Sequence, residues 1–238
     1  MSQPTSSPNA LFSARVLAAW SPSPGTRAVR VERPPNLEFL ASQAVRLALG
    51  EDQFRPMSIA SGPARPYLDF AVEHSASAFK HAFYTLAPGD SVRVSSPRGP
   101  LLLDRRRPGI MVASGIGITP FRSMLHALAD APDTLRGALV HATRTSADVP
   151  FHEEMDTLAE IARLPVHRSV GPVPNEVLRS LAADFPAATW YLAGPVEDVR
   201  DVAENLIAIG VQRDALRLEA FRYPGSLATP STQPGPST

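Results

Sequence analysis

The hydrophobic pattern of the chain changes near residue 105. Before this point, short segments alternate apolar and polar residues, which is typical of half-buried strands. Proline, glycine and charged residues separate the segments, and their spacing suits an antiparallel barrel or sandwich. The expected strands are 14–20, 26–33, 43–50, 54–61, 67–74 and 90–96. The stretch SAFKHAFYTLAPGD, residues 77–90, interrupts them and predicts a short helix.

From residue 109 onward, short apolar runs alternate with segments of helical periodicity. In residues 197–210, for example, apolar side chains recur at the three- and four-residue spacing of a helix face. Repeated strand–helix units predict a parallel sheet with helices on both faces. Expected strands lie at 109–115, 137–143, 164–170, 189–195 and 215–221, and expected helices at 119–129, 149–162, 175–184 and 197–210. The boundary between the halves is expected at residues 104–108, a charged stretch that ends in proline.

Composition excludes several kinds of function. The 238 residues include no cysteine, which excludes disulfides, thiolate nucleophiles and Cys-held zinc or iron–sulfur sites. Basic and acidic residues number 23 each, so no net field favours nucleic acid or an anionic membrane. The six histidines lack metal-ligand spacing, and no metal site is expected. Without an apolar run near ~20 residues or a signal-peptide pattern, the protein is expected to be soluble and cytoplasmic.

The first candidate site is VASGIGITPFRSML, residues 112–125. Gly115 and Gly117 follow an expected strand, Thr119 suits a helix N-cap, and Pro120 suits the first helical position. Glycines permit close approach to a ligand, and the free N–H groups of a helix start bind phosphates. An ordinary strand–turn–helix connection would explain the same residues, so this motif alone leaves nucleotide binding open.

Two further stretches are candidates. In WYLAGPVEDV, residues 190–199, a strand enters a helix through Ala-Gly-Pro, at the end of a strand where open parallel sheets bind ligands. A tight turn without a ligand is the simpler interpretation. In RPMSIAS, residues 55–61, a strand begins with Arg55 and carries a serine three residues later. An edge strand with a solvated arginine would explain that stretch equally well.

Together, the order and spacing of these stretches resemble the ferredoxin–NAD(P) reductase superfamily, and within it the flavin-reductase-like members. The resemblance runs from about residue 13 to residue 225. It rests on six motifs in register, each weak alone and specific in combination. They are Arg55, Pro56, Met57, Ser58, Ala60 and Ser61; Pro97, Gly99 and Leu101; Gly115, Gly117, Thr119 and Pro120; Arg144, Phe151 and Glu154; Ala193, Gly194 and Pro195; and Glu219 and Phe221.

The resemblance implies a fold and a function. It implies an N-terminal six-stranded antiparallel Greek-key β-barrel for flavin over residues 13–104 and a C-terminal Rossmann-like parallel α/β domain for NAD(P)H over residues 108–225. The tails, 1–12 and 226–238, are expected to be disordered. The implied activity moves a hydride from NAD(P)H to flavin N5, and electrons onward to a separate ferredoxin, flavodoxin or oxygenase component.

Two alternatives to this activity remain. One is an NAD(P)H:flavin reductase that uses free flavin as its substrate. The other is a non-catalytic electron-transfer subunit or flavin-sensing module.

The resemblance also implies roles for individual residues. Arg55 would contact the flavin phosphate, Ser58 would reach the N5 edge, and Glu219 would be the second catalytic residue. The other flavin contacts would be Pro56, Met57, Ser77, Gly99 and Phe221. The NAD(P) contacts would be Gly115, Gly117, Thr119, Pro120, Arg144, Ala193, Gly194 and Pro195.

Several positions depart from the family pattern. Met57 replaces an aromatic residue that stacks on the flavin, and Ala193 replaces a cysteine near the nicotinamide. The phosphate turn keeps only Ser77, so FMN is possible beside FAD. For the nucleotide, Arg144 and Arg168 are expected to converge near the 2′-phosphate position with only Asp148 opposing them, which slightly favours NADPH over NADH.

Overall fold

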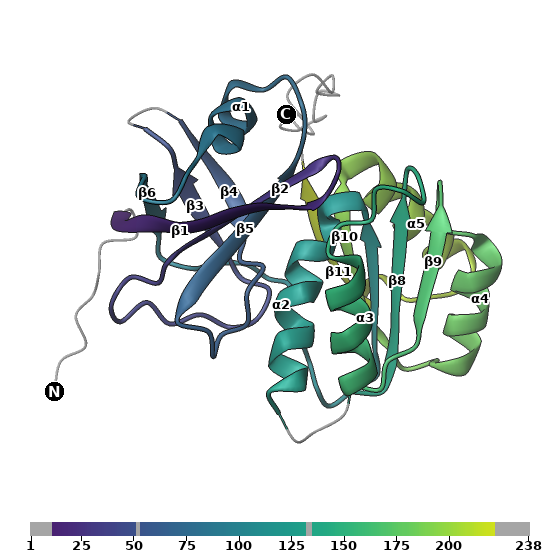
Figure 1. Ribbon diagram of the computed structural model, residues 1–238. Helices are drawn as coiled ribbons and strands as arrows, with labels where there is room; N and C mark the ends of the chain where they lie inside the picture. Colours follow the sequence, from purple (N-terminus) through teal and green to yellow (C-terminus); the bar gives the residue numbers. More distant parts are fainter. Residues whose placement is uncertain (1–10, 51–52, 132–134, 222–238) are drawn as a thin grey trace, which may run out of the picture.

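The computed structural model of the chain describes residues 11–50, 53–131 and 135–221. It contains two domains that lie side by side, a β-sheet domain followed by an α/β domain (Figure 1). Most of the two expected tails falls outside the described residues. Leu11 and Phe12, however, already belong to the first strand, so the boundary expected at residue 13 is two residues too late.

The first domain is an antiparallel sheet of six strands in the order β4-β3-β6-β1-β2-β5. The long strand β1 pairs with β6 along its first part and with β2 along its second part, which lets the sheet curl round. A backbone hydrogen bond from Ala60 to Asp69 links the segment after β4 to β5. The six-stranded barrel is thus confirmed. Its strands are β1 (Leu11–Ser23), β2 (Thr26–Glu32), β3 (Ala44–Ala48), β4 (Phe54–Ser58), β5 (Tyr67–Glu73) and β6 (Ser91–Ser95).

The barrel core comes from alternate strand residues together with one helix. Leu68 and Phe70 on β5 are fully buried, because side chains two residues apart share one face of a strand. The predicted helix is present as α1 (Ala78–Thr85). Its residues Phe79 and Phe83 pack into the same core and cover one end of the barrel.

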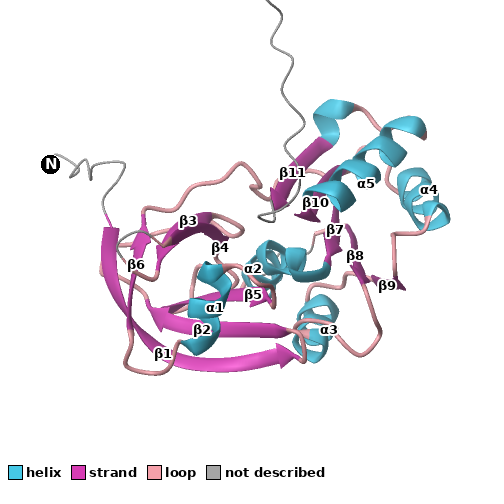
Figure 2. Ribbon diagram, turned by 90° about the horizontal axis from the view of Figure 1, so that it is seen from above, coloured by secondary structure: helices cyan, strands magenta, loops and turns pink. Residues whose placement is uncertain are grey.

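The second domain is a parallel sheet of five strands in the order β11-β10-β7-β8-β9. Because β7 lies between β10 and β8, the strand order reverses at the carboxyl ends of β7 and β10, where ligands bind in open sheets. Helices cover both faces of the sheet (Figure 2). The strands are β7 (Gly109–Ser114), β8 (Gly137–Thr143), β9 (Val166–Val170), β10 (Thr189–Pro195) and β11 (Leu216–Phe221). The helices are α2 (Ile118–Ala129), α3 (His152–Ile161), α4 (Asn175–Asp184) and α5 (Val196–Ala208).

This sheet has a hydrophobic layer on each face, and its three central strands, β7, β8 and β10, are therefore buried almost throughout. Met111 and Tyr191 belong to the layer under α2 and α3. Their chain neighbours Ile110 and Trp190 belong to the layer under α4 and α5. Within the described part of the chain, no helix is both long and apolar enough to cross a membrane.

A buried ion network joins the two domains. Arg122 on α2 bonds to Asp69 on β5 at 3.1 Å, and their side chains are only 3% and 1% exposed. The same guanidinium donates to the carbonyl of Ala60 in the first domain and binds Glu154 on α3 at 2.7 Å. Because a buried charge without a partner is very costly, this network fixes how α2 meets the barrel.

Candidate functional site

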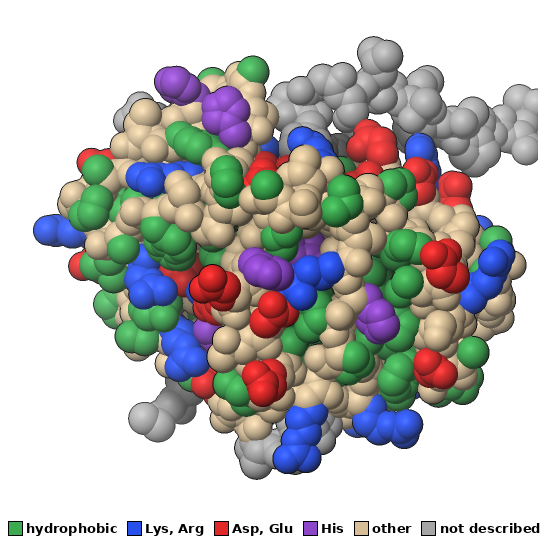
Figure 3. Space-filling view, turned by 45° about the vertical axis from the view of Figure 1, so that its right-hand side comes forward, with side chains coloured by type: hydrophobic (Ala, Val, Ile, Leu, Met, Phe, Trp, Pro, Cys, Tyr) green, Lys and Arg blue, Asp and Glu red, His purple; other side chains and the backbone are tan. Residues whose placement is uncertain are grey.

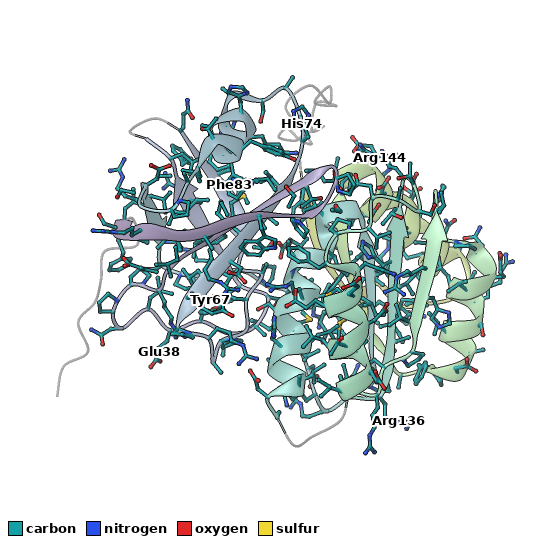
Figure 4. The ribbon with its side chains drawn as sticks, in the orientation of Figure 1. Glu38, Tyr67, His74, Phe83, Arg136 and Arg144 are labelled. Carbon is teal, nitrogen blue, oxygen red and sulfur yellow. The ribbon has the colours of Figure 1, made fainter. Side chains whose placement is uncertain are left out.

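A groove of about 600 Å³ lies at the carboxyl ends of β7, β8, β9 and β10. Residues of both domains line it, so it lies at their junction as well as at the switch point of the sheet. Figure 4 shows His74 of the first domain and Arg144 of the second on the same side of the molecule, flanking this junction. Two glycines at the groove, Gly25 and Gly115, come from different domains.

The turn after β7 begins at Gly115, which lines the groove. A 3-10 turn, η1 (Gly115–Gly117), connects β7 to α2. Gly115 has φ of +52°, a left-handed conformation that favours glycine. His141 on β8 donates from Nε2 to the carbonyl of Gly115 at 3.0 Å, since a carbonyl can only accept. Burial lowers the pKa of His141 to about 4, so the ring is neutral at physiological pH and steadies the turn without adding charge.

Glu73 reaches this turn from the barrel. It is the last residue of β5, and its Oε1 accepts the N–H of Ile116 at 2.8 Å. A Cβ added to Gly115 would lie 2.3 Å from that oxygen, so the carboxylate lies directly over the glycine. Glu73 is not among the site residues that the sequence predicts. Its one signal in the sequence is an acidic residue that ends an otherwise apolar strand.

Gly117 lies close against strand β10. It is buried, and a Cβ added there would lie 2.0 Å from the carbonyl oxygen of Ala193 on β10. Gly117 therefore allows the start of α2 to pack against β10. Gly194 is similar, because its Cβ would meet Ser114 at 2.8 Å and its φ is +152°.

The predicted helix start is wrong by one to two residues. Helix α2 begins at Ile118 with Gly117 at its N-cap position, so Thr119 is not the cap and Pro120 is the third helical residue. The hydroxyl of Thr119 donates instead to the carbonyl of Ile116 at 3.0 Å. The error arises because η1 already turns the chain before Thr119 is reached.

The predicted nucleotide residues divide into two groups. Four of them line the groove and can contact a ligand there: Gly115, Arg144, Ala193 and Pro195. The other four support the turns behind it: Gly117, Thr119, Pro120 and Gly194. A nucleotide contact stays a prediction for all eight.

The expected convergence of two arginines at the groove is wrong. Arg144 is exposed and lines the groove, but Arg168 on β9 forms an ion pair with Asp156 on α3. Val170, which ends β9, is apolar and 62% exposed.

The groove also carries more acidic residues than Asp148 alone. Asp148 accepts the N–H of Gly25 at 3.0 Å, and the carboxylate of Asp198 accepts the hydroxyl of Ser114. The acidic side chains that line the groove are Glu73, Asp148, Glu197, Asp198 and Asp201.

Ser58 and Glu219 meet across the domain junction. The hydroxyl of Ser58, at the end of β4, donates to the carboxylate of Glu219 on β11. Burial raises the pKa of Glu219, and the hydrogen bond from Ser58 opposes part of that rise. Glu219 is the register partner of Ala193 on β10, which lines the groove. The two expected catalytic residues thus contact each other, next to a strand that lines the groove.

Arg55 lies next to the start of α1. Its Cζ is 5.7 Å from the ring centroid of Phe79, and one guanidinium N–H bonds to the carbonyl of Phe54 at 2.8 Å. Among the described residues no carboxylate pairs with it. In the loop before α1, the hydroxyl of Ser75 has no hydrogen-bond partner, and Ser77 caps the helix by accepting the N–H of Lys80. A cation, a helix N-terminus and an unpaired hydroxyl together fit a phosphate group.

The other predicted flavin residues occupy varied environments. Met57 is partly buried against the barrel core, and Pro56 is exposed on β4. Gly99 has φ of +141°, a conformation that requires glycine. Phe221 is partly buried at the end of β11. Their contacts with a flavin stay predictions.

The aromatic residue and the acid of the expected Arg-aromatic-acid motif contact a different arginine. Phe151 lies 4.7 Å from the guanidinium of Arg122, and Glu154 forms an ion pair with the same group. Burial would raise the pKa of Glu154, but hydrogen bonds from His126 and Arg122 outweigh it and lower the pKa to about 2. This part of the motif therefore contacts the arginine that joins the domains through Asp69 and Ala60.

Known proteins share both the sequence pattern and the fold. Residues 111–202 match the family described as an oxidoreductase NAD-binding domain. Ferredoxin–NADP reductase B of Sorangium cellulosum is 34% identical over 157 residues, which cover 62% of this chain and 64% of that protein. The ferredoxin–NAD(P)(+) reductase component of the naphthalene 1,2-dioxygenase system of Pseudomonas putida is 25% identical over 235 residues, 92% of this chain and 71% of that one.

A solved structure supports the same fold assignment. The ferredoxin NADP+ reductase of Neisseria gonorrhoeae, solved with bound FAD and NADP, superposes with a TM-score of 0.73 at 20% identity. The match covers 88% of this chain and 98% of that one. This chain spans less than two thirds of the length of the Sorangium relative.

Proposed function

We propose that the chain belongs to the ferredoxin–NAD(P) reductase superfamily and is an NAD(P)H-dependent flavoprotein reductase with flavin at the domain junction. The flavin, when bound, would accept a hydride at N5 and release electrons to a separate acceptor. FAD is the proposed flavin, since the Neisseria structure of this fold contains FAD and NADP.

The observation that carries this proposal is the contact between Ser58 and Glu219. It brings the barrel strand that carries Arg55 next to the strand pair β10–β11, whose Ala193 lines the groove. A flavin held by the barrel and a nicotinamide held in the groove would therefore meet at this contact. Holding two reactants in this way can supply much of a rate enhancement.

The chain's own residues have distinct tasks in this proposal. Arg55 and the start of α1 bind the phosphate of the flavin. The hydroxyl of Ser58 can donate and accept hydrogen bonds, so it serves a flavin edge that changes its protonation on reduction. Glu219 has a raised pKa because it is buried, which suits a group that holds a proton beside Ser58.

The electron acceptor is proposed to be a separate ferredoxin, flavodoxin or oxygenase component. The absence of cysteine excludes a Cys-held cluster within this chain, so one-electron carriers must come from elsewhere. The names of the Sorangium and Pseudomonas relatives support a ferredoxin or oxygenase system. Basic, acidic and apolar side chains are mixed over the face shown in Figure 3, so an acceptor docking there would be selected by local contacts.

A free-flavin reductase is the second candidate. Met57 in place of a stacking aromatic residue favours it, because the flavin would be held less firmly on that side.

An absorption spectrum of the purified protein, with identification of the released flavin, separates the two candidates. Co-purified FAD supports a bound cofactor, whereas a colourless protein that reduces added flavin supports the second candidate. Oxidation of NADH or NADPH with an artificial acceptor completes the test. No oxidation with either nucleotide, with flavin supplied, contradicts both and supports a non-catalytic module.

The charge of the groove bears on the choice of nucleotide. A 2′-phosphate adds up to two negative charges, while Arg144 is the one arginine among the described groove residues and five acids line the same groove. Arg168 is engaged with Asp156. These observations favour NADH.

A further inference from the structure

We infer that Glu73 is an internal anion that competes with the diphosphate of the nucleotide, and so sets the affinity of the groove for NAD(P)H. The inference rests on the proposed function, because it concerns the same groove. Glu73 belongs to the barrel, while the turn that it contacts belongs to the α/β domain. It was not among the residues expected to bind a ligand.

The geometry shows what the carboxylate occupies. Oε1 of Glu73 accepts the N–H of Ile116 at 2.8 Å, in the turn that starts α2. N–H groups at the start of a helix are the natural donors to a phosphate. The carboxylate also lies over Gly115, at 2.3 Å from the position of a Cβ. It thus fills the side on which the absence of a side chain would let a ligand approach the backbone.

The negative charges of Glu73 and of a diphosphate make them compete for the same N–H group. One N–H cannot serve two anions in the same place, and like charges a few ångströms apart repel each other. A diphosphate that binds at Gly115 must therefore move Glu73 aside. The charge of Glu73 is also felt by Lys80 on α1, because it raises the pKa of that amine against the larger effect of burial, which lowers it.

This exchange also couples nucleotide binding to the junction. The contact of Glu73 with Ile116 is a hydrogen bond between the domains, and its loss on nucleotide binding would loosen the β5 edge of the groove. The affinity for nucleotide therefore includes the cost of breaking this bond.

The substitution Glu73→Gln tests the role of charge. A glutamine amide oxygen can still accept the N–H of Ile116, so the turn keeps its partner while the negative charge is removed. The probe is ADP, which carries a diphosphate but cannot donate a hydride, and binding is measured by calorimetry on the flavin-loaded protein. We expect Kd for ADP to fall about tenfold, which corresponds to ~1.4 kcal/mol. Kd for adenosine, which has no phosphate, should not change.

Asp201→Asn is the matched control. Asp201 lines the same groove on α5 and does not lie over Gly115. A smaller gain in affinity for ADP in Asp201→Asn than in Glu73→Gln supports the inference. An equal gain overturns it, because the overall negative charge of the groove would then explain both results. An unchanged Kd in Glu73→Gln, or no ADP binding by either form, also overturns it. Normal ADP binding without NAD(P)H oxidation would instead contradict the proposed function and leave the role of Glu73 standing.

Discussion

Ser58 and Glu219 are 161 residues apart in the chain, and their side chains form a hydrogen bond across the domain junction. Ser58 ends a barrel strand, whereas Glu219 lies on the edge strand of the parallel sheet. Neither domain alone contains the pair. The contact therefore exists only when the two domains are docked, and it lies where we propose that a flavin and a nicotinamide meet.

The first prediction concerns this pair. Ser58→Ala and Glu219→Gln should each retain flavin, because neither residue contacts the expected phosphate site. Reduction of the flavin by NAD(P)H should nevertheless slow by about a hundredfold or more, which is the usual contribution of a positioned proton-transfer group. Anaerobic stopped-flow absorbance measures the rate. Ser91→Ala, on the exposed start of β6, is the control and should keep the parental rate. Parental reduction by Ser58→Ala would show that the assigned N5 role is wrong.

The second prediction concerns the phosphate of the flavin. Arg55→Ala should lose most of its flavin, because a charge-assisted contact to phosphate is removed. The fold should remain, since Arg55 is exposed. Flavin content per protein measures the effect, and circular dichroism checks the fold. Arg93→Ala removes a half-buried arginine on β6 and should keep its flavin. If Arg55→Ala keeps its full flavin content, Arg55 does not bind the flavin phosphate, and the phosphate site must lie elsewhere.

Much of the fold could be predicted because the two domains have different periodicities. Alternation with period two marked the barrel strands, and apolar runs between helical segments marked the parallel sheet. Strand β4 shows the limit of this reasoning, since it ends at Ser58 although the apolar pattern continues to Ser61. Ser61 instead contacts strand β5, because its hydroxyl donates to the carbonyl of Tyr67 and accepts the N–H of Asp69.

The site was harder to predict, because several of its contacts join the two domains. Glu73 and Ile116 are 43 residues apart, and Asp69 and Arg122 are 53 apart. No local pattern encodes such pairs. The resemblance supplied Ser58 and Glu219, but it could not indicate that Gly117 packs against β10.

The third prediction separates the two glycines of the turn. Gly117→Ala should lower the free energy of unfolding by about 1–3 kcal/mol, because its Cβ would meet backbone atoms of Ala193 that cannot move aside. Gly115→Ala should cost about 1–2 kcal/mol from its left-handed φ, and its Cβ meets the movable side chain of Glu73. Urea denaturation measures stability, and KM for NAD(P)H is measured alongside. If Gly117→Ala keeps the parental stability but raises KM for NAD(P)H, a direct contact between Gly117 and the nucleotide would explain the result better.

The fourth prediction concerns pH. The pKa of Glu154 is about 2 in the folded chain against an ordinary value of 4.5, so its ionised form stabilises the fold above pH 4.5 and this contribution is lost as the pH falls towards 2. Glu154→Gln should therefore be less stable than the parent at pH 7, and the difference should shrink below pH 4.5. Thermal unfolding at several pH values measures it. Glu153→Gln, its exposed neighbour on α3, should show little difference at any pH. A difference in stability between Glu154→Gln and the parent that stays the same at all pH values would show that the ion pair is not its cause.

The last prediction concerns nucleotide choice. We expect kcat/KM for NADH to exceed that for NADPH by about tenfold or more, because Arg144 faces five acids in the groove and Arg168 is held by Asp156. Adding a cation at the end of β9 should narrow this gap. Val170 is 62% exposed there and precedes Gly171, which lines the groove, so Val170→Arg should raise kcat/KM for NADPH and leave that for NADH nearly unchanged.

Ile161→Arg is the control for this prediction, because it adds the same charge at a 55% exposed apolar position at the end of α3. It should not change the ratio of the two kcat/KM values, since a screened surface charge acts only over about 10 Å. Arg144→Ala should reduce the use of NADPH more than that of NADH. The parent protein could instead prefer NADPH and lose that preference in Arg144→Ala. This result would show that the attraction of Arg144 for the 2′-phosphate outweighs the repulsion by the acidic residues. A preference for NADPH that survives this substitution would place the 2′-phosphate outside this part of the groove.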